Sequence, residues 1–465
     1  MYLDIFIERK DIKMKYFGTD GIRRIANTEL TPEFVYTISK AGAYVLTKHV
    51  KEKAKPRIIL GRDTRISGTL IESAMTAGFL SSGADVELVG VAPTPAIAYL
   101  TKKTNADMSV VISASHNTFE YNGIKFFSNK GTKIPDDIEE EIEEAIDSGI
   151  ALKREIESQD IGVACIKENL VDDYFNFVVN IFKDDIKKYN TEDFVVGIDT
   201  ANGATYKIAE KIFTELGIKY KIINNNPDGI NINKNCGSTH LEQLRQYVLE
   251  NKLSMGIAYD GDGDRCLTVN EKGEEVNGDI ILAIIADYMK KNNMLEKNKI
   301  VATVMSNIGL NKYAENNNLE LVQTKVGDRY VLEEMLKNGG NFGGEQSGHI
   351  ILSDYNLTGD GIVTSLMIIK ILLESGKSFS EVCKLITIYP QTLINVKVKE
   401  FDMSKYPEIQ EIISKTEKEL EGEGRVLIRK SGTEPLFRIM LEGRDKNYID
   451  QAAKEIANII EDKMS

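Results

Sequence analysis

Apolar and polar residues along this chain follow one plan three times. Each copy has a short apolar run, an amphipathic segment, a second run, a second segment and a third run that ends in a polar loop. The first runs are 57–60, 194–199 and 299–304, and the amphipathic segments space apolar residues as in Ile208, Ile212 and Leu216. Such spacing predicts helices, whereas continuous Val/Ile-rich runs are typical of strands buried on both faces. We therefore predict three related α/β domains with parallel or mixed sheets.

The three repeats end in loops with chemically capable side chains, namely "SASHN" (113–117), "DGDGDR" (260–265) and "GGEQSGH" (343–349). Functional loops of α/β sheets lie beyond the carboxyl ends of the strands, so these loops occupy equivalent places. After Tyr389 the plan changes to two strands around a "KSGTEP" turn and a final amphipathic segment, which predicts a smaller α+β domain. We expect domains at 1–165, 166–270, 271–388 and 389–465.

Composition narrows the function classes. A formal net charge of −13 disfavours nucleic acid and anionic membranes as partners, and an anionic substrate would need positive charge concentrated in its site. The apolar runs are too short to span a bilayer, and residues 1–13 make a poor signal peptide, so they are a short extension or Met14 is the start. The cysteines are scattered without a CxxC pair: Cys165, Cys236, Cys266 and Cys383. This pattern predicts free thiols in the cytoplasm and no zinc site.

Asp260, Asp262 and Asp264 alternate with glycines in the second loop. Three carboxylates so close together repel one another, and a hard divalent cation relieves that repulsion. An EF-hand loop fits poorly, because its sixth position would be Arg265 instead of glycine and a β run precedes it. A solvated acidic turn is the weaker alternative. Magnesium at a phosphoryl site is the favoured interpretation.

Several roles are open to Ser115 in the first loop. It could be a nucleophile with His116, a metal or phosphate ligand, or the polar end of a strand capping a helix. Adjacent side chains on extended chain point apart, and neither a G-x-S-x-G elbow nor a Walker lysine motif is present. The residues alone leave this choice open.

The stretch "RKSGTEPLFR" concentrates anion-binding groups near the C-terminus. Arginine forks, hydroxyls and turn amides together suit a phosphate; the residues concerned are Arg429, Ser431, Gly432, Thr433 and Arg438. A β-hairpin with surface arginines explains the stretch equally well by itself.

Taken together and in order, "SASHN…NGIKFF", "DGDGDR", "GEQSGH" and "RKSGTEP" resemble the four signature loops of the α-D-phosphohexomutase superfamily. "YFGTDGIRR" and "TKVGDRYV" match it as well, and the similarity runs from about Lys15 to the C-terminus. Within the superfamily the chain is most similar to bacterial phosphoglucosamine mutases, and Gln346 stands where other members more often have methionine.

This resemblance implies three related α/β domains with mixed sheets and a smaller C-terminal α+β domain around a central cleft. It implies a phosphoryl group on Ser115 and one Mg²⁺ held by that phosphoserine with Asp260, Asp262 and Asp264. The implied reaction is the interconversion of glucosamine 6-phosphate and glucosamine 1-phosphate, which feeds UDP-N-acetylglucosamine synthesis. Glucosamine- or glucose-1,6-bisphosphate would be intermediate and activator.

The resemblance also implies roles for further residues. Lys125 matches the general acid/base, with His116 and Arg23 placing phosphate and hydroxyl and Arg265 contacting the phosphoserine. Because a lysine normally titrates too high for this work, we expect Arg23 or the metal to depress its pKa. The sugar would meet Glu345, Ser347 and Lys325, and the distal phosphate would meet the arginine loop.

Two positions depart from the superfamily pattern: Thr118 replaces a proline and Arg24 replaces a glycine. Neither removes a reacting group, but the first relaxes a fixed φ in the serine loop. Three alternatives stay open, namely a phosphomannomutase/phosphoglucomutase, a non-catalytic sugar-phosphate binding protein and a phosphatase. The expected partner is a small sugar phosphate, and the oligomeric state is open, a homodimer included.

Overall fold

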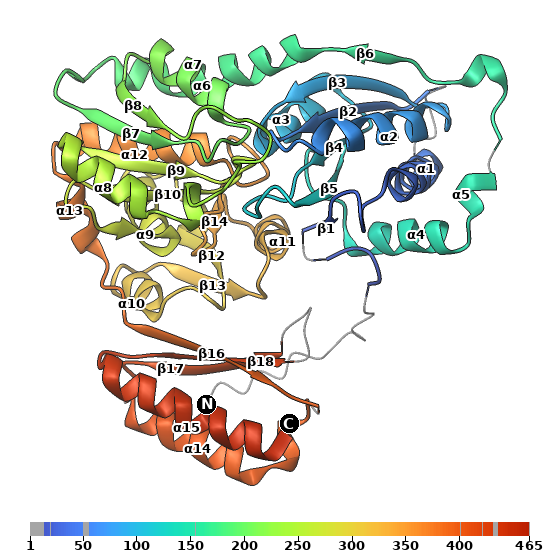
Figure 1. Ribbon diagram of the computed structural model, residues 1–465. Coiled ribbons are helices and arrows are strands. Elements are labelled where there is room, and N and C mark those ends of the chain that lie inside the picture. Colours follow the sequence, from blue (N-terminus) through green and yellow to red (C-terminus); the bar gives the residue numbers. More distant parts are fainter. Residues whose placement is uncertain are drawn as a thin grey trace.

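The computed structural model describes residues 14–18, 20–49, 55–153, 155–399, 401–420, 422–430 and 436–464. Figure 1 shows three α/β units with a smaller sheet-and-helix unit beside them. The strands of the four sheets fall within residues 22–166, 195–276, 299–352 and 391–442. The predicted fold class is confirmed, while the domain boundaries stay predictions.

The first unit has a six-stranded sheet in the order β1-β5-β4-β2-β3-β6. Strands β4, β2, β3 and β6 run parallel, and β5 pairs antiparallel with both β4 and β1. All five residues of β4 are buried, as its continuous apolar run predicts. The elements of the first unit are β1 (Ile22–Ile25), α1 (Pro32–His49), β2 (Arg57–Arg62), α2 (Gly68–Leu80), β3 (Asp85–Val91), α3 (Thr94–Thr104), β4 (Met108–Ile112), β5 (Tyr121–Ser128), α4 (Asp136–Asp147), α5 (Ile150–Lys153) and β6 (Ala164–Ile166).

The second unit has the sheet order β11-β10-β9-β7-β8, in which β9, β7 and β8 run parallel. Strands β10 and β11 continue the sheet antiparallel beyond β9. The central strand β9 is fully buried. The elements of the second unit are α6 (Val171–Ile186), β7 (Val195–Asp199), α7 (Tyr206–Glu215), β8 (Lys219–Ile223), α8 (Glu242–Asn251), β9 (Met255–Tyr259), β10 (Cys266–Asn270) and β11 (Glu275–Val276).

The third unit repeats this arrangement in the order β13-β12-β14-β15, with β12 parallel to both β13 and β14. In each unit the third strand of the repeat pairs with the first and then turns into an antiparallel partner, so the three polar loops occupy the same topological place. The elements of the third unit are α9 (Gly278–Lys291), β12 (Lys299–Thr303), α10 (Ile308–Asn316), β13 (Glu320–Thr324), α11 (Asp328–Asn338), β14 (Phe342–Gly344), β15 (Ile350–Leu352), α12 (Gly361–Ser375) and α13 (Phe379–Val382).

The fourth unit is an antiparallel sheet, β16-β18-β17, covered on one face by two helices. Figure 1 shows this sheet between α14 and α15 on one side and the three larger units on the other. Its elements are β16 (Gln391–Lys397), α14 (Pro407–Glu419), β17 (Arg425–Lys430), β18 (Leu436–Glu442) and α15 (Lys446–Met464).

Polar contacts fasten the third unit to the fourth. Asn307 caps α10 by accepting from Gly309 N–H at 3.0 Å, and its amide also bonds both sides of residue 389. Asn307 Nδ2 donates to Tyr389 O and Asn307 Oδ1 accepts from Tyr389 N–H, each at 2.9 Å. The Arg425 guanidinium donates to Ser306 O across the same junction. Within the described ranges, no helix or strand of the fourth unit packs extensively on the other three.

Within the described residues the sheets are supported by a large apolar core shared among the first three units, by one core within the first unit and by one within the fourth, and smaller apolar clusters lie within the second and third units. Helix α12 is apolar on nearly all sides because it lies inside the shared core. No helix in the described part of the chain has the length and apolar character needed to cross a membrane.

Candidate active site

Ser115 lies in the loop from β4 to β5 and is buried, with an exposed fraction of 1%. Its backbone is left-handed, with φ of +50°. Its hydroxyl donates to Asp260 Oδ2 at 2.6 Å. The left-handed turn also brings Ser115 Oγ within 3.4 Å of His116 Nδ1. This differs from the expectation that the two side chains point apart, because that expectation assumed an extended chain.

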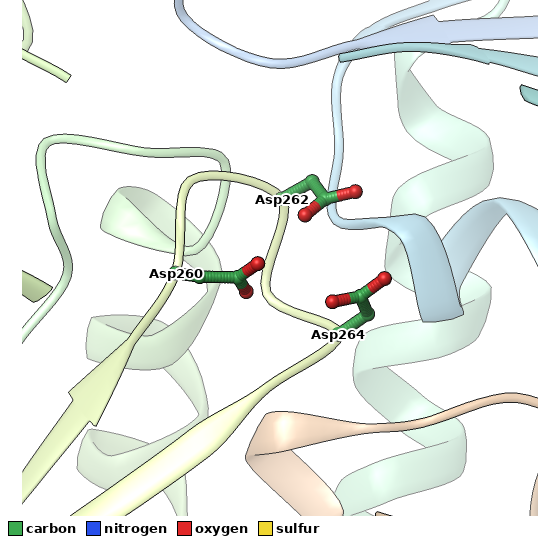
Figure 2. Close-up of side chains that lie close together, drawn as sticks. All are labelled: Asp260, Asp262 and Asp264. Carbon is green, nitrogen blue, oxygen red and sulfur yellow. The ribbon is translucent and has the colours of Figure 1, made fainter. Parts of the chain in front are cut away.

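The three predicted aspartates come together in the β9–β10 loop. Figure 2 shows the side chains of Asp260, Asp262 and Asp264 on one turn of chain, with their carboxylates gathered around a common space. Their oxygens lie within 4.8 Å of one another and all three residues are buried. The loop forms a turn, with Gly263 at φ of +71°. The result is a three-carboxylate cluster facing Ser115.

The donor set of this cluster fits a hard divalent cation. Asp262 Oδ1 and Asp264 Oδ1 are buried without a hydrogen-bond partner in the described part of the chain, and such oxygens are costly unless paired. Burial and repulsion from the other two carboxylates raise the pKa of Asp260 well above its usual range. Thr94 Oγ1 donates to Asp262 Oδ2 at 2.7 Å and helps to orient that carboxylate. Carboxylate oxygens with free lone pairs are the ligands that Mg²⁺ and Ca²⁺ prefer.

Lys125, on β5, reaches the same cluster from the first unit. Its Nζ lies 2.7 Å from Asp262 Oδ2, 3.3 Å from Asp264 Oδ2 and 3.0 Å from Asp20 Oδ2. Burial alone would lower the pKa of Lys125, but these carboxylates raise it well above its usual range. Arg23 lowers the pKa of Lys125, as expected, but the three carboxylates outweigh it. The pKa of Lys125 is therefore raised, and the depressed pKa that we expected is not found. A cation on the aspartates would compete with Lys125 for the same oxygens.

Two guanidinium groups beside the cluster keep spare donors. Arg23 bonds Asp20 and donates to Asn117 Oδ1 at 3.3 Å, while its Nε is buried without a hydrogen-bond partner within the described residues. Arg265 Nε is also unpaired there. Burial, with the nearby Arg265 and Arg23, lowers the pKa of His116 to about 4, so this imidazole is neutral at neutral pH. Spare guanidinium donors suit a phosphoryl group.

The third loop brings two of its three predicted sugar contacts together. Glu345 accepts from Gly327 N–H at 3.1 Å, and Ser347 Oγ lies 3.5 Å from Glu345 Oε2. Burial raises the pKa of Glu345. Lys325 is exposed just after β13, two residues before Gly327. A carboxylate, a hydroxyl and an exposed ammonium group are therefore available to a polar ligand.

The predicted distal phosphate site lies on the fourth unit. Arg429 on β17 stands opposite Arg438 on β18, on the sheet face away from the core residues Phe437 and Ile439 that pack against the helices. Both arginine Nε atoms are buried without a hydrogen-bond partner in the part of the chain the structure describes. Burial and the neighbouring Arg438 lower the pKa of Arg429. Two adjacent cations with spare donors favour an anionic ligand.

Three members of that predicted site fall outside the described residues: Ser431, Gly432 and Thr433.

The two departures from the superfamily pattern have simple surroundings. Thr118 is exposed, and its carbonyl accepts from the Arg65 guanidinium. Arg24 donates to Lys15 O at 3.1 Å and lies over the Tyr16 ring at 6.0 Å. Neither side chain reaches the aspartate cluster.

The structure adds charged groups that we did not predict. Asp20 pairs with both Lys125 and Lys133, and Lys133 Nζ also lies 2.6 Å from Asp328 Oδ2 on the third unit. His349 Nε2 accepts from Gly359 N–H at 2.9 Å, and its Nδ1 lies 3.7 Å from Asp264 Oδ1. Asp20, Asp328 and His349 all lie within motifs already singled out, so the motifs were a usable signal. Lys133 had none.

Four consecutive segments match the domains described as phosphoglucomutase/phosphomannomutase: alpha/beta/alpha domain I (14–152), domain II (172–273), domain III (277–389) and the C-terminal domain (393–459). The chain belongs to this family of phosphohexomutases, and the assignment made from its motifs is confirmed.

A curated relative supports the same family assignment. The phosphoglucosamine mutase of Ruminiclostridium cellulolyticum is 52% identical over 455 residues, which cover 97% of this chain and 100% of that protein.

Solved structures share the fold at lower identity. A phosphoglucomutase/phosphomannomutase family protein from Burkholderia thailandensis superposes with a TM-score of 0.77 at 20% identity, covering 96% of this chain and 97% of that chain. The N-acetylphosphoglucosamine mutase of Aspergillus fumigatus, solved with GlcNAc-6P and magnesium, has a TM-score of 0.65 at 17% identity, covering 97% and 96%.

Proposed function

We propose that this chain is a phosphoglucosamine mutase, which interconverts glucosamine 6-phosphate and glucosamine 1-phosphate through a phosphoserine and a 1,6-bisphosphate. The single observation that carries the proposal is the 2.6 Å hydrogen bond from Ser115 Oγ to Asp260 within the buried aspartate cluster. Moving a phosphoryl group between two oxygens of one sugar without releasing it requires a carrier on the protein, and Ser115 is placed to be one. The amino-sugar preference is supported by the name of the 52% identical relative.

In this proposal Asp260, Asp262 and Asp264 hold Mg²⁺ together with the phosphoserine. The cation, when bound, neutralises the charge that develops on the equatorial phosphoryl oxygens. Arg23 and Arg265, whose Nε groups have no hydrogen-bond partner among the described residues, would donate to the same oxygens.

Lys125 is the proton carrier in this proposal. Protonated Lys125 suits the acid that returns a proton to Ser115 Oγ as the phosphoryl group leaves, and this agrees with its raised pKa. The proton that the attacking sugar hydroxyl loses restores protonated Lys125. In the opposite transfer the Ser115 hydroxyl attacks the sugar phosphate, so Lys125 takes up the proton of Ser115 Oγ and returns one to the departing sugar oxygen. His116, neutral and 3.4 Å from Ser115 Oγ, places the serine oxygen.

Substrate recognition is divided between two units. Glu345, Ser347 and Lys325 bind the sugar hydroxyls, and Arg429 with Arg438 binds the phosphate distant from Ser115. The residues Ser431, Gly432 and Thr433 complete that phosphate site. After the first transfer the bisphosphate turns end for end, so that its other phosphate faces Ser115, and the fourth unit follows it.

The location is proposed as cytoplasmic, which the four free cysteines support. A homodimer stays a prediction.

The test measures isomer formation from glucosamine 6-phosphate with glucosamine- or glucose-1,6-bisphosphate and Mg²⁺ present, alongside intact-mass analysis of the protein. We expect turnover and a phosphate on Ser115, both lost in Ser115→Ala and kept in the exposed control Ser148→Ala. Full-rate isomerisation by Ser115→Ala would show that Ser115 does not carry the phosphoryl group. Faster turnover of mannose or glucose phosphates indicates a phosphomannomutase/phosphoglucomutase, and free phosphate in excess of isomer indicates a phosphatase.

A further inference from the structure

One buried arginine, Arg65, binds the backbone of the loop that carries Ser115. Arg65, just after β2, has an exposed fraction of 1%, and both terminal nitrogens of its guanidinium donate to backbone carbonyls of this loop. One terminal nitrogen donates to Ser115 O at 3.0 Å and to Asn117 O at 2.8 Å. The other donates to Tyr121 O at 3.0 Å and to Thr118 O. This one side chain therefore contributes hydrogen bonds to four backbone carbonyls of the loop.

Arg65 is itself fixed by a buried acid that also reaches the serine. Asp63 Oδ2 accepts from Arg65 Nε at 2.8 Å and from Ser113 Oγ at 2.6 Å. Ser113 Oγ in turn accepts the Ser115 N–H at 2.9 Å. Both peptide groups that flank the Ser115 side chain are therefore tied to one buried ion pair.

A second side chain binds the same carbonyls from the second unit. Asn233 is buried, and its Nδ2 donates to Ser115 O at 2.8 Å and to Asn117 O at 2.9 Å. Gly261, between the first two aspartates, permits this approach, because a Cβ there would lie 2.5 Å from Ser115 O. The serine loop is thus held between two units at the point where its hydroxyl meets the aspartates.

We propose that Arg65 and Asn233 are positioning residues that hold Ser115 in its left-handed conformation, with its hydroxyl aimed at the aspartate cluster. The φ of +50° is one that non-glycine residues rarely adopt, so it persists only where the surroundings impose it. Without the two donors Ser115 relaxes toward negative φ, and its oxygen leaves the transfer geometry. The inference rests on the proposed function, because it concerns phosphoryl transfer at this serine.

The experiment uses Arg65→Lys, which keeps the charge beside Asp63 but lacks the fork that spans four carbonyls. Its control is Arg62→Lys on β2, where the arginine pairs with Glu72 at 3.3 Å. The second variant is Asn233→Gly, which keeps the left-handed backbone at φ of +56° and removes only the amide. Its control is Asn235→Gly, an exposed asparagine at φ of +54° two positions away.

For Arg65→Lys and Asn233→Gly we expect kcat to fall by about ten-fold or more, since small misplacements of a reacting group are costly, while KM changes by less than about two-fold. The folded fraction, followed by thermal unfolding, should match that of the controls. A kcat equal to wild type in Asn233→Gly, or a fall in kcat matched by an equal loss of folded protein in both variants, overturns the inference. If wild type itself neither isomerises sugar phosphates nor carries phosphate on Ser115, the proposed function fails instead.

Discussion

Replacing Gly261 by alanine should separate the two loops that meet at the active site. The added Cβ would lie 2.5 Å from Ser115 O and 2.7 Å from Asn233 Nδ2, and contacts under 3.0 Å do not persist. Ser115 O and residue 261 must therefore move apart by at least about 0.5 Å. Since a misplacement of about 1 Å can cost roughly 100-fold in rate, we expect kcat to fall by about ten-fold. The strain of overpacking should also lower the free energy of unfolding by about 1–3 kcal/mol.

The assay combines steady-state isomerisation with a chemical unfolding curve for each protein. Gly68→Ala, at the start of α2, is the control, because a Cβ there would meet only the flexible Arg62 side chain at 3.1 Å. We expect Gly68→Ala to keep its rate. A Gly261→Ala enzyme with wild-type kcat and stability would refute the reasoning, since it would mean that the Ser115 and aspartate loops are not held at contact distance.

Three further predictions concern other parts of the molecule. Arg429→Ala should raise KM by roughly 10- to 100-fold, the value of charged hydrogen bonds, without preventing phosphorylation of Ser115; an unchanged KM would count against the distal site, and the exposed Arg444→Ala is the control. Asp262→Asn should raise the Mg²⁺ concentration for half-maximal activity by at least about ten-fold, and a chelator should stop the wild type; an unshifted Mg²⁺ titration would exclude Asp262 as a ligand. Burial raises the pKa of Asp199 from 3.8 to about 6, so the folded state holds that proton more tightly and loses about 3 kcal/mol as pH rises through this window. The stability of wild type relative to Asp199→Asn, from denaturant curves, should therefore fall between about pH 4 and pH 6 and level off above; a pH-independent difference would contradict the assignment.

The central parallel strands of the fold were predictable because they are short, continuous apolar runs between amphipathic helices. Strands β4, β9 and β12 are fully buried, and a segment buried on both faces needs no alternation. The two strands around the KSGTEP turn of the fourth unit were predicted, whereas the antiparallel strands that complete the sheets of the first three units were not. Strand β15 has only three residues, and β1 carries two adjacent arginines, so neither has a periodic pattern long enough to read.

The candidate site was predictable where reacting side chains share a short loop. The aspartates are neighbours in sequence, so their cluster follows from local spacing, and Ser115 joins them because the two loops are equivalent in related units. The groups that were missed act through pairs distant in sequence. Lys133 pairs with Asp328 across 195 positions, a proximity that no local pattern encodes.

The single covalent crossing into the fourth unit limits how that unit can turn. Asn307 fixes both sides of Tyr389, and the next residue is Pro390, whose ring removes one backbone torsion and biases Tyr389 toward extended geometry. Fewer backbone torsions at this junction are therefore free to turn the small sheet against the third unit. A hinge placed here would swing the Arg429 and Arg438 pair as one rigid piece, because both arginines stand on the same sheet beyond it.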